Sequence, residues 1–363
     1  MNKSLRILIA FNEPPISEDV RQRTPLYVSY EEGLQGSLKA MQPSGLAEIS
    51  VVEEMEAVNN ALKQNGYETF VLGVADDAMA FIRSLMDFRP DLIFNLVESF
   101  RDEAIHEIHM AGLYELLGFP YTGSPPLALG IALNKWRAKE ILSFHHIPTP
   151  KFVLVNPHED TFGLGDHWDL PFPVIVKPAS EDASTGIDEH AVVFSMEQLL
   201  ERVAYVHTKF RQPALVEEYI DGRELNVAIV GNKEPIVLPI SEIDFSEMPE
   251  HHPRIVTYAS KWIAESEAYQ KEKPLCPAPL SPEVERRVKS IALKAYRVIG
   301  CRDYARVDIR MNSDGDIFVI EVNPNPDISR DAGFMRSARV YGWSFEETVN
   351  RIVELAWERS QRK

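Results

Sequence analysis

Cysteine is nearly missing from this sequence of 363 residues, which contains only Cys276 and Cys301. Two isolated cysteines supply neither a disulfide framework nor the paired spacing of a zinc site. We therefore expect a protein of a reducing compartment, the cytoplasm. The histidine pairs at 145–146 and 251–252 do not suggest zinc either, because adjacent side chains do not readily face one ion.

Long hydrophobic runs and an excess of positive charge are missing too. No apolar run approaches the roughly 18 residues of a membrane span. The short run at the N-terminus stops at Asn12-Glu13-Pro14-Pro15, so we interpret it as a first strand and not as a signal peptide. A net charge of −17 argues against a broad basic face for nucleic acid. It still allows a few lysines to hold an anionic ligand.

The length predicts two or three domains, and the first 117 residues alternate strands with helices, which is typical of a parallel α/β sheet. The expected strands are 5–11, 67–72 and 91–96, and the expected helices are 51–65, 78–88 and 102–117. Between the first strand and the first helix, the stretch from 12 to about 46 contains prolines and glycines without a period. A lid over a substrate and a peripheral excursion both remain open for it.

The rest of the chain mixes helices with strands that suit antiparallel pairing. We expect helices at 134–145, 282–299 and 345–359, strands at 173–177 and 214–220, and an antiparallel pair at 225–230 and 235–240. A hairpin at 304–310 and 316–322 surrounds the turn sequence NSDG. The glycine pattern at 162–168 lacks the flanking strand and helix of a nucleotide loop.

The hairpin carries the most informative pattern and runs into FVIEVNPNPDIS (318–329). Alternate strand residues share a face, about 6.6 Å apart at ~3.3 Å per residue. Arg306 and Asp308 therefore point one way, and Glu321 and Asn323 share a face of the partner strand. If these faces coincide, three oxygen ligands and a guanidinium meet, a set that suits Mg²⁺ bound to phosphates. A solvent-facing hairpin with ordinary ion pairs is the alternative, which the apolar neighbours disfavour.

Other charged residues could complete a nucleotide site. Lys177 ends an apolar strand, and the loop Ser184-Thr185-Gly186 could cradle phosphate with its backbone N–H groups. Glu217 and Glu224 could bind adenosine. Each feature has an ordinary alternative, since a lysine often marks a strand edge and Lys135 alone is typical of a surface. No nucleophile motif such as G-x-S-x-G occurs, so covalent catalysis by a side chain is not expected.

Taken together and in order, these pieces resemble the ATP-grasp superfamily and, within it, the D-alanine–D-alanine ligase family. The resemblance extends from about Glu48 to Glu354. Its segments are LLGFPYTGS (116–124), LNKWRAKEIL (133–142), PVIVKPASEDASTGI (173–187), LVEEYIDGRELNVAIVG (215–231), LCPAPLS (275–281), and YARVDIR (304–310) with FVIEVNPNP (318–326).

The resemblance implies an α/β (α+β) protein with three domains around a cleft. A parallel α/β domain would occupy 1–124, with the irregular insertion at 13–46. A small central domain would occupy 125–221, and a C-terminal antiparallel-sheet domain 222–363. The implied ligands are ATP and Mg²⁺, with two ions expected and Mn²⁺ as an alternative. The implied partners are amino-acid or peptide substrates, with a homodimer as an open oligomeric state.

Residue by residue, the resemblance assigns roles on the nucleotide side. Lys135, Lys177 and Lys261 would contact the ATP phosphates. Glu217, Tyr219 and Ile220 would border the adenine, and Glu224 would bind the ribose. The metal ligands would be Asp308, Glu321 and Asn323. The catalytic residues would be Arg306, Lys261 and Ser184, of which Arg306 would stabilise the acyl phosphate and the tetrahedral intermediate.

The substrate side departs from the family's pattern. Where the family has an HGxxGEDG-like stretch, this chain has NLVESFRDEAIHE (95–107). Ala332 stands where the family has a serine for the second substrate, and Asp327 stands where it has a glycine after proline. Trp262 stands where the family has a tyrosine after the phosphate-binding lysine, and the phosphate loop reads Ala183-Ser184-Thr185-Gly186 in this chain. The N-terminal glutamate has only a loose counterpart in Glu48, with Glu13 and Glu18 as weaker ones. The substrate candidates are Glu48, Arg101, Ser329 and Arg330.

Three functions are compatible with this reading. The first is an ATP- and Mg²⁺-dependent carboxylate–amine ligase, for D-alanine or for a different amino acid or small acceptor. The second is a non-catalytic ATP-binding protein of the same fold, against which the joint presence of Arg306, Asp308, Glu321 and Asn323 argues. The third is a kinase-like transfer that stops before amine attack.

Overall fold

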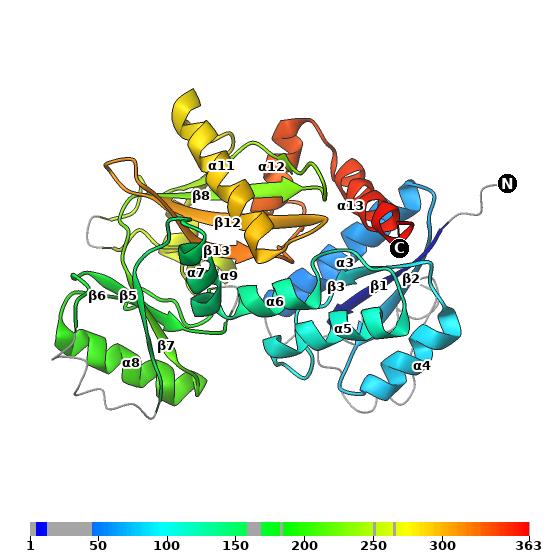
Figure 1. The fold of residues 1–363 in the computed structure, drawn as a ribbon, viewed down its shortest axis with the longest axis horizontal. Helices are drawn as coiled ribbons and strands as arrows, with labels where there is room; N and C mark the ends of the chain where they lie inside the picture. Colours follow the sequence, from blue (N-terminus) through cyan, green and yellow to red (C-terminus); the bar gives the residue numbers. More distant parts are fainter. Residues whose placement is uncertain are drawn as a thin grey trace.

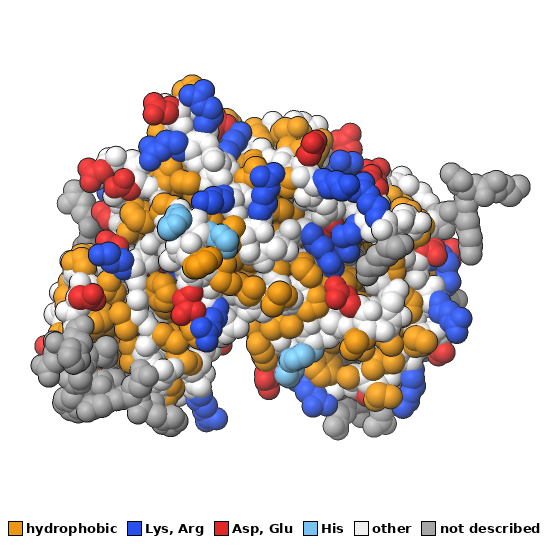
Figure 2. All heavy atoms as spheres, in the orientation of Figure 1, with side chains coloured by type: hydrophobic (Ala, Val, Ile, Leu, Met, Phe, Trp, Pro, Cys, Tyr) orange, Lys and Arg blue, Asp and Glu red, His pale blue; other side chains and the backbone are white. Residues whose placement is uncertain are grey.

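A computed structural model describes residues 5–12, 46–157, 168–181, 184–249, 252–263 and 266–362, with the backbone alone for 46–50 and 262. Three sheets organise this part of the chain (Figure 1). The face drawn in Figure 2 is notched between the lobe that carries α8 and the lobe that carries α4 and α5. Nearly all of the expected insertion, with Glu13 and Glu18, lies outside the described residues. Among the described ones, no helix is long and apolar enough to cross a membrane.

The first sheet is parallel, in the order β2-β1-β3, as the alternating pattern predicted. Its strands are β1 (Arg6–Asn12), β2 (Glu68–Val74) and β3 (Leu92–Leu96). Alternate residues of β1 pack against α3 (Leu46–Gln64) on one face and against α4 (Ala78–Phe88) and α5 (Glu107–Leu117) on the other. The helix expected from 102 begins later, after the short η1 (Ala104–His106), because Arg101 and Asp102 adopt positive φ angles of 53° and 59°.

The second sheet is antiparallel, in the order β4-β7-β5-β6. It consists of β4 (Phe152–Val155), β5 (Val174–Pro178), β6 (Val192–Val193) and β7 (Ala214–Glu218). Helix α8 (Met196–Phe210), which the sequence patterns did not predict, packs Leu199, Val203 and Val206 on its apolar face. This sheet holds Lys177 on β5 and Glu217 on β7.

The third sheet carries the predicted hairpin. Its order is β11-β10-β8-β12-β13, with β9 paired to β8. The strands are β8 (Arg223–Val230), β9 (Ile236–Val237), β10 (Ser241–Asp244), β11 (Lys273–Leu275), β12 (Tyr304–Met311) and β13 (Ile317–Asn323). The short helices α9 (Tyr258–Trp262) and α10 (Glu267–Lys271) lie between β10 and β11 in the chain.

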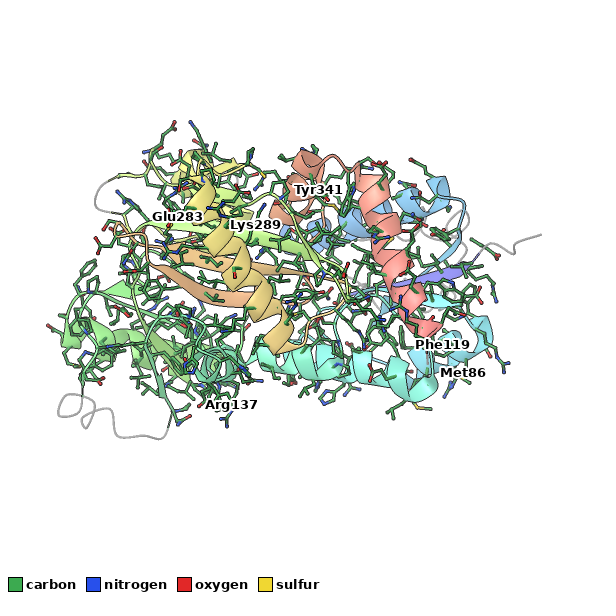
Figure 3. All side chains as sticks on the ribbon, turned by 45° about the horizontal axis from the view of Figure 1, so that its top comes forward. Met86, Phe119, Arg137, Glu283, Lys289 and Tyr341 are labelled. Carbon is green, nitrogen blue, oxygen red and sulfur yellow. The ribbon has the colours of Figure 1, made fainter. Side chains whose placement is uncertain are left out.

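Three helices cover one face of this sheet, and polar side chains gather on the opposite face. Leu225, Val227, Val307 and Ile309 share a core with α6 (Pro126–Leu133), α7 (Lys135–Phe144) and α11 (Pro282–Ile299), and α11 lies across the sheet in Figure 3. Because side chains alternate along a strand, the residues between them face the opposite side. These include Glu224, Asn226, Arg306 and Asp308.

The last two helices return to the first sheet. Phe334 of α12 (Gly333–Tyr341) and Ile352 of α13 (Phe345–Ser360) share a core with Met55 of α3, and α13 lies beside α3 in Figure 1. The first and third sheets are therefore joined by one apolar core, and the domain boundaries at 124 and 221 stay a prediction.

Candidate active site

The hairpin brings four of the predicted residues into two direct cross-strand pairs. Arg306 lies opposite Asn323, and Asp308 lies opposite Glu321. Opposite residues of an antiparallel pair are about 4.5–5.5 Å apart at their Cβ atoms. A β-bulge shifts the register between Asp308 and Ile309, just beyond these pairs. The two faces that the alternation predicted therefore coincide.

Asp308 is the centre of this face. Its carboxylate accepts two hydrogen bonds of 2.8 Å from the Arg306 guanidinium and one of 2.8 Å from each amide of Asn226 and Asn323. Burial by itself lowers the pKa of Arg306, but the carboxylates of Asp308, Glu321 and Asp327 together outweigh this effect, so that the pKa rises. Asn226 was not predicted, although it lies two residues after Glu224 and so shares its face of β8.

Positive charge from α7 meets this face at Glu321. Lys135, the first residue of α7, forms an ion pair with Glu321, although the two are 186 residues apart in the chain. Burial raises the pKa of Glu321, but Lys135, Lys177 and Lys261 together lower it to about 2. Glu321 is therefore a carboxylate at neutral pH, surrounded by lysines that could also face phosphate.

A second lysine of α7 holds a buried acid of the central sheet. Lys139 Nζ lies 3.1 Å from Glu217 Oε1, and Lys177 Nζ lies 3.0 Å from Glu217 Oε2. Lys139 also donates a 2.9 Å hydrogen bond to Thr149 Oγ1, which donates 2.8 Å to the carbonyl oxygen of Val319 on β13. Burial lowers the pKa of Lys139 to about 8. This network ties the predicted phosphate lysine Lys177 to the strand that carries Glu321.

Arg310 holds the segment that was predicted to border adenosine. Its guanidinium donates to Glu224 Oε2 at 3.0 Å and to the carbonyl oxygens of Ile220 and Gly222 at 3.0 and 3.4 Å. Burial raises the pKa of Glu224, and Arg310 opposes this effect. The hydroxyl of Tyr219 accepts a 2.9 Å hydrogen bond from the backbone N–H of Arg254. Arg310, which the sequence reasoning did not single out, thus orders this turn.

Lys261 lies on α9, which a capping box at Thr257 begins. Its ammonium is close enough to Arg306, Asp308 and Glu321 for their charges to act on it. Loss of hydration among these groups lowers the Lys261 pKa, and Arg306 lowers it further, although the residue as a whole is exposed. Lys261 therefore belongs to the same charged cluster as the hairpin.

The phosphate-loop candidate Ser184 lies in a tight turn. Ser184 has a left-handed φ of 60°, and its carbonyl accepts a 2.9 Å hydrogen bond from the N–H of Ile187. Gly186 has φ 76°, and a Cβ atom there would lie 2.7 Å from Pro178 Cγ. The turn therefore packs closely against the end of β5, next to Lys177.

The loop after Asn323 is anchored on the first sheet's helices. Ile328 N–H donates a 2.8 Å hydrogen bond to Glu54 Oε1 on α3, and Asn325 Nδ2 donates 3.0 Å to Glu107 Oε1 on α5. Burial, followed by the charges of Asp327 and Glu98, raises the pKa of Glu54 well above its ordinary range. The sequence reasoning missed Glu54 because nothing in the period of α3 distinguishes it from its exposed neighbour Glu53.

The predicted substrate residues are dispersed. The Arg101 guanidinium donates to the carbonyl oxygen of Asp76 at 3.1 and 3.0 Å, and Arg330 pairs with Glu346 at 3.0 Å. Ser329 N–H donates to Asp327 at 2.7 Å. In the described part of the chain, neither arginine bonds to the hairpin residues, and the side chain of Glu48 lies outside it. Their roles in substrate binding stay predictions.

The donor set at the hairpin fits a hard cation. Asp308 and Glu321 supply carboxylate oxygens from adjacent strands, and the amide of Asn323 supplies a third oxygen. The described residues contain no cluster of three or more His, Cys, Asp and Glu side chains with metal-binding geometry. An ion such as Mg²⁺ would therefore draw its other ligands from water and from phosphates, as Mg²⁺ usually does.

Comparisons with known proteins agree with this architecture. The family model described as D-ala D-ala ligase C-terminus matches residues 141–354. An uncharacterized protein of Sinorhizobium fredii is 35% identical over 312 residues, 84% of this chain and 87% of that protein. The D-alanine–D-alanine ligase of Desulforudis audaxviator is 34% identical over 312 residues, 84% of this chain and 92% of that protein.

A solved structure is similar over the whole chain. The D-alanine–D-alanine ligase from Bacillus anthracis complexed with ATP has a TM-score of 0.71, with 99% of each chain covered and 22% sequence identity. At this identity the likeness shows the fold alone, which is the ATP-grasp fold.

Proposed function

This chain belongs to the D-alanine–D-alanine ligase family, and from this premise we propose that it is an ATP-dependent, ADP-forming ligase that joins a carboxylate to an amine. One observation carries the proposal: Arg306, Asp308, Glu321 and Asn323 share one face of the hairpin, and Lys135 meets that face at Glu321. A lysine that could bind phosphate thus lies beside oxygen donors that could bind a hard cation, and this combination suits phosphoryl transfer.

The chain's own residues would bind ATP from three sides. Lys135, Lys177 and Lys261 would hold the phosphates as point charges. Glu224 would bind the ribose hydroxyls, and the turn at Tyr219 and Ile220 would contact the adenine. Glu217 supports Lys177 through its ion pair, so its contribution to nucleotide binding would be partly indirect.

The first half of the reaction would make an acyl phosphate. A carboxylate oxygen of the first substrate attacks the γ-phosphorus, the bond from that phosphorus to the β–γ bridging oxygen breaks, and ADP leaves with the electron pair. Arg306 would stabilise the charge on the transferred group, and the turn at Ser184 would position the phosphates. Mg²⁺ held by Asp308, Glu321 and Asn323, with two ions expected, would shield the phosphate charges.

The second half would form the amide. The neutral amine nitrogen of the second substrate attacks the acyl carbon, and Arg306 would stabilise the tetrahedral intermediate. The bond between the acyl carbon and the phosphate oxygen then breaks, phosphate leaves, and the nitrogen loses a proton. Asp308 holds Arg306 by two hydrogen bonds, so the guanidinium needs little reorganisation during both halves.

We propose amino acids or small amine acceptors as substrates, with D-alanine–D-alanine ligation as the alternative. The relative from Desulforudis audaxviator is named D-alanine–D-alanine ligase, which supports the alternative. The positions that depart from the family's pattern, Ala332, Asp327 and 95–107, favour another substrate pair. A cytoplasmic location also belongs to this proposal, since the chain has only two cysteines.

A substrate screen tests the proposal. The purified protein is given ATP, Mg²⁺ and pairs of amino acids including D-alanine, ADP release is followed, and products are identified by mass spectrometry. We expect ADP and an amide in equal amounts, and loss of both in Glu321→Gln. A protein that binds ATP but never turns it over would instead be the non-catalytic member of the fold, and a phosphorylated product without amide would make it a kinase.

A further inference from the structure

Arg336, on the first turn of α12, has a guanidinium whose hydrogen bonds go to neutral oxygens, with the charge of Asp331 acting on it without an ion pair. Its guanidinium donates to Ser241 Oγ and to the carbonyl oxygen of Asp331, both at 3.0 Å. Within the described residues no carboxylate forms an ion pair with it, although the chain contains 55 acidic against 38 basic residues. Arg306, in contrast, is neutralised by Asp308.

Arg336 is also half-buried, and loss of hydration is the largest of the effects that lower its pKa. A charge that is withdrawn from water is costly unless it is paired with an opposite charge. Neutral oxygens satisfy only part of the five N–H donors of a guanidinium. An anion from outside the chain would complete the set.

The sheet places Arg336 on the same side as the reaction centre. Ser241 on β10 lies opposite Asn226 on β8, Asn226 lies opposite Asp308, and Asp308 lies opposite Glu321. These four residues form one row across the face, and Ser241 and Asp308 are separated by two strand spacings, ~10 Å. Arg336 contacts the Ser241 end of this row, and Lys135 contacts the Glu321 end.

Gly333 shows how close Arg336 comes to the centre of the row. A Cβ atom on Gly333 would lie 3.6 Å from Asn226 Oδ1 and 3.9 Å from Arg336 Nη1. Asn226 in turn donates to Asp308. A small group bound over Gly333 would therefore reach both the guanidinium and the hairpin.

We propose that Arg336, with Ser241, binds the carboxylate of the amine substrate, so that the acceptor is an amino acid and not a neutral amine. A guanidinium matches a carboxylate with two parallel N–H donors. Ala332, which stands where the family's serine is expected, lies one helical turn before Arg336, and the Arg336 N–H donates to its carbonyl oxygen at 2.9 Å. The Arg336 guanidinium thus supplies, from one turn later in the helix, the hydrogen-bond donor that the side chain of Ala332 lacks.

This inference rests on the proposed ligase function, and the test separates the two. Kinetics are measured with the best amino-acid acceptor from the screen and with its carboxamide. We expect wild type to prefer the acid. Arg336→Gln should raise the KM of the acid by about 10- to 100-fold, the effect of losing a charge-assisted hydrogen bond, and should abolish the preference. Arg336→Lys should restore part of it, and kcat and the KM of ATP should change little.

Arg339→Gln is the matched control, because Arg339 is on the same helix, is exposed, and donates among the described residues to the Arg330 carbonyl oxygen alone. Equal use of acid and carboxamide by wild type, an unchanged acceptor KM in Arg336→Gln, or an equal rise in the KM of ATP would overturn the inference while leaving the ligase proposal intact. If Arg336→Gln does not fold, the acid-against-carboxamide comparison in wild type and Arg336→Lys decides. Absence of any amide product would overturn the ligase proposal itself.

Discussion

Replacing Lys139 by methionine should destabilise the protein through Glu217. The side chains of Lys139 and Glu217 are 1% and 2% exposed, and their charged atoms are 3.1 Å apart. Removing one partner of a buried pair typically costs about 3–5 kcal/mol. Lys177 stays 3.0 Å from the other carboxylate oxygen, which favours the lower end, and the lost hydrogen bond to Thr149 adds about 1 kcal/mol. We expect a loss of about 3–4 kcal/mol.

Urea unfolding of Lys139→Met and wild type measures this loss. Arg137→Met is the matched control, because Arg137 lies on the same helix, at the outer edge of the molecule in Figure 3. Its pair with Glu140 is 2.8 Å long but 58% and 48% exposed, and such a pair is worth only about 0.3–0.5 kcal/mol. If Lys139→Met costs no more than the control, or if Lys139→Met and Glu217→Gln add without coupling, the buried network does not hold the two sheets as described.

Three further outcomes follow from the site. Glu54→Gln should flatten the pH dependence of the unfolding free energy. Because the folded-state pKa of Glu54 is raised, its contribution to stability is present at low pH and is lost as the pH rises towards that pKa, by at most about 1.4 kcal/mol per pH unit. A parallel decline in the variant would exclude Glu54 as the source. Gly222→Ala should lower the free energy of unfolding by about 3 kcal/mol or more and raise the KM of ATP, because its Cβ would lie 2.2 Å from the Met311 carbonyl oxygen. In the control Gly315→Ala the new Cβ meets no atom within 4 Å, so the loss of stability should be clearly smaller. Equal losses of stability would refute the clash. Asn226→Asp should lower ATP turnover about 100-fold by setting a carboxylate against Asp308, and near-normal turnover would show that Asp308 tolerates like charge.

The hairpin was predictable because its signals are local. A turn sequence between two apolar runs sets the antiparallel pair, and the period of two along each strand decides which residues share a face. The bulge after Asp308 was not predictable, because neither the turn sequence nor the period of the strands marks it. Without the bulge, the register nearer the turn would place Ile320, and not Glu321, opposite Asp308. The shared face of Arg306, Asp308, Glu321 and Asn323 therefore depends on the bulge.

The buried lysine and the arginine of α12 illustrate what local patterns miss. Lys139 lies between Arg137 and Glu140, in a run of charges that is typical of an exposed helix face, and only tertiary packing against Glu217 buries it. Helices α8 and α12 were also missed. Without α12 in place, Arg336 had no visible relation to the hairpin, which is more than ten residues earlier in the chain.

The most direct test of the account follows oxygen through the reaction. A first substrate labelled with ¹⁸O in its carboxylate is incubated with the protein, ATP, Mg²⁺ and the acceptor, and the released phosphate is analysed by mass spectrometry. An acyl phosphate at the Arg306–Asp308 hairpin predicts one ¹⁸O atom in each phosphate released with the amide. Unlabelled phosphate would contradict it, because ATP would then have been cleaved without passing its phosphoryl group to the carboxylate.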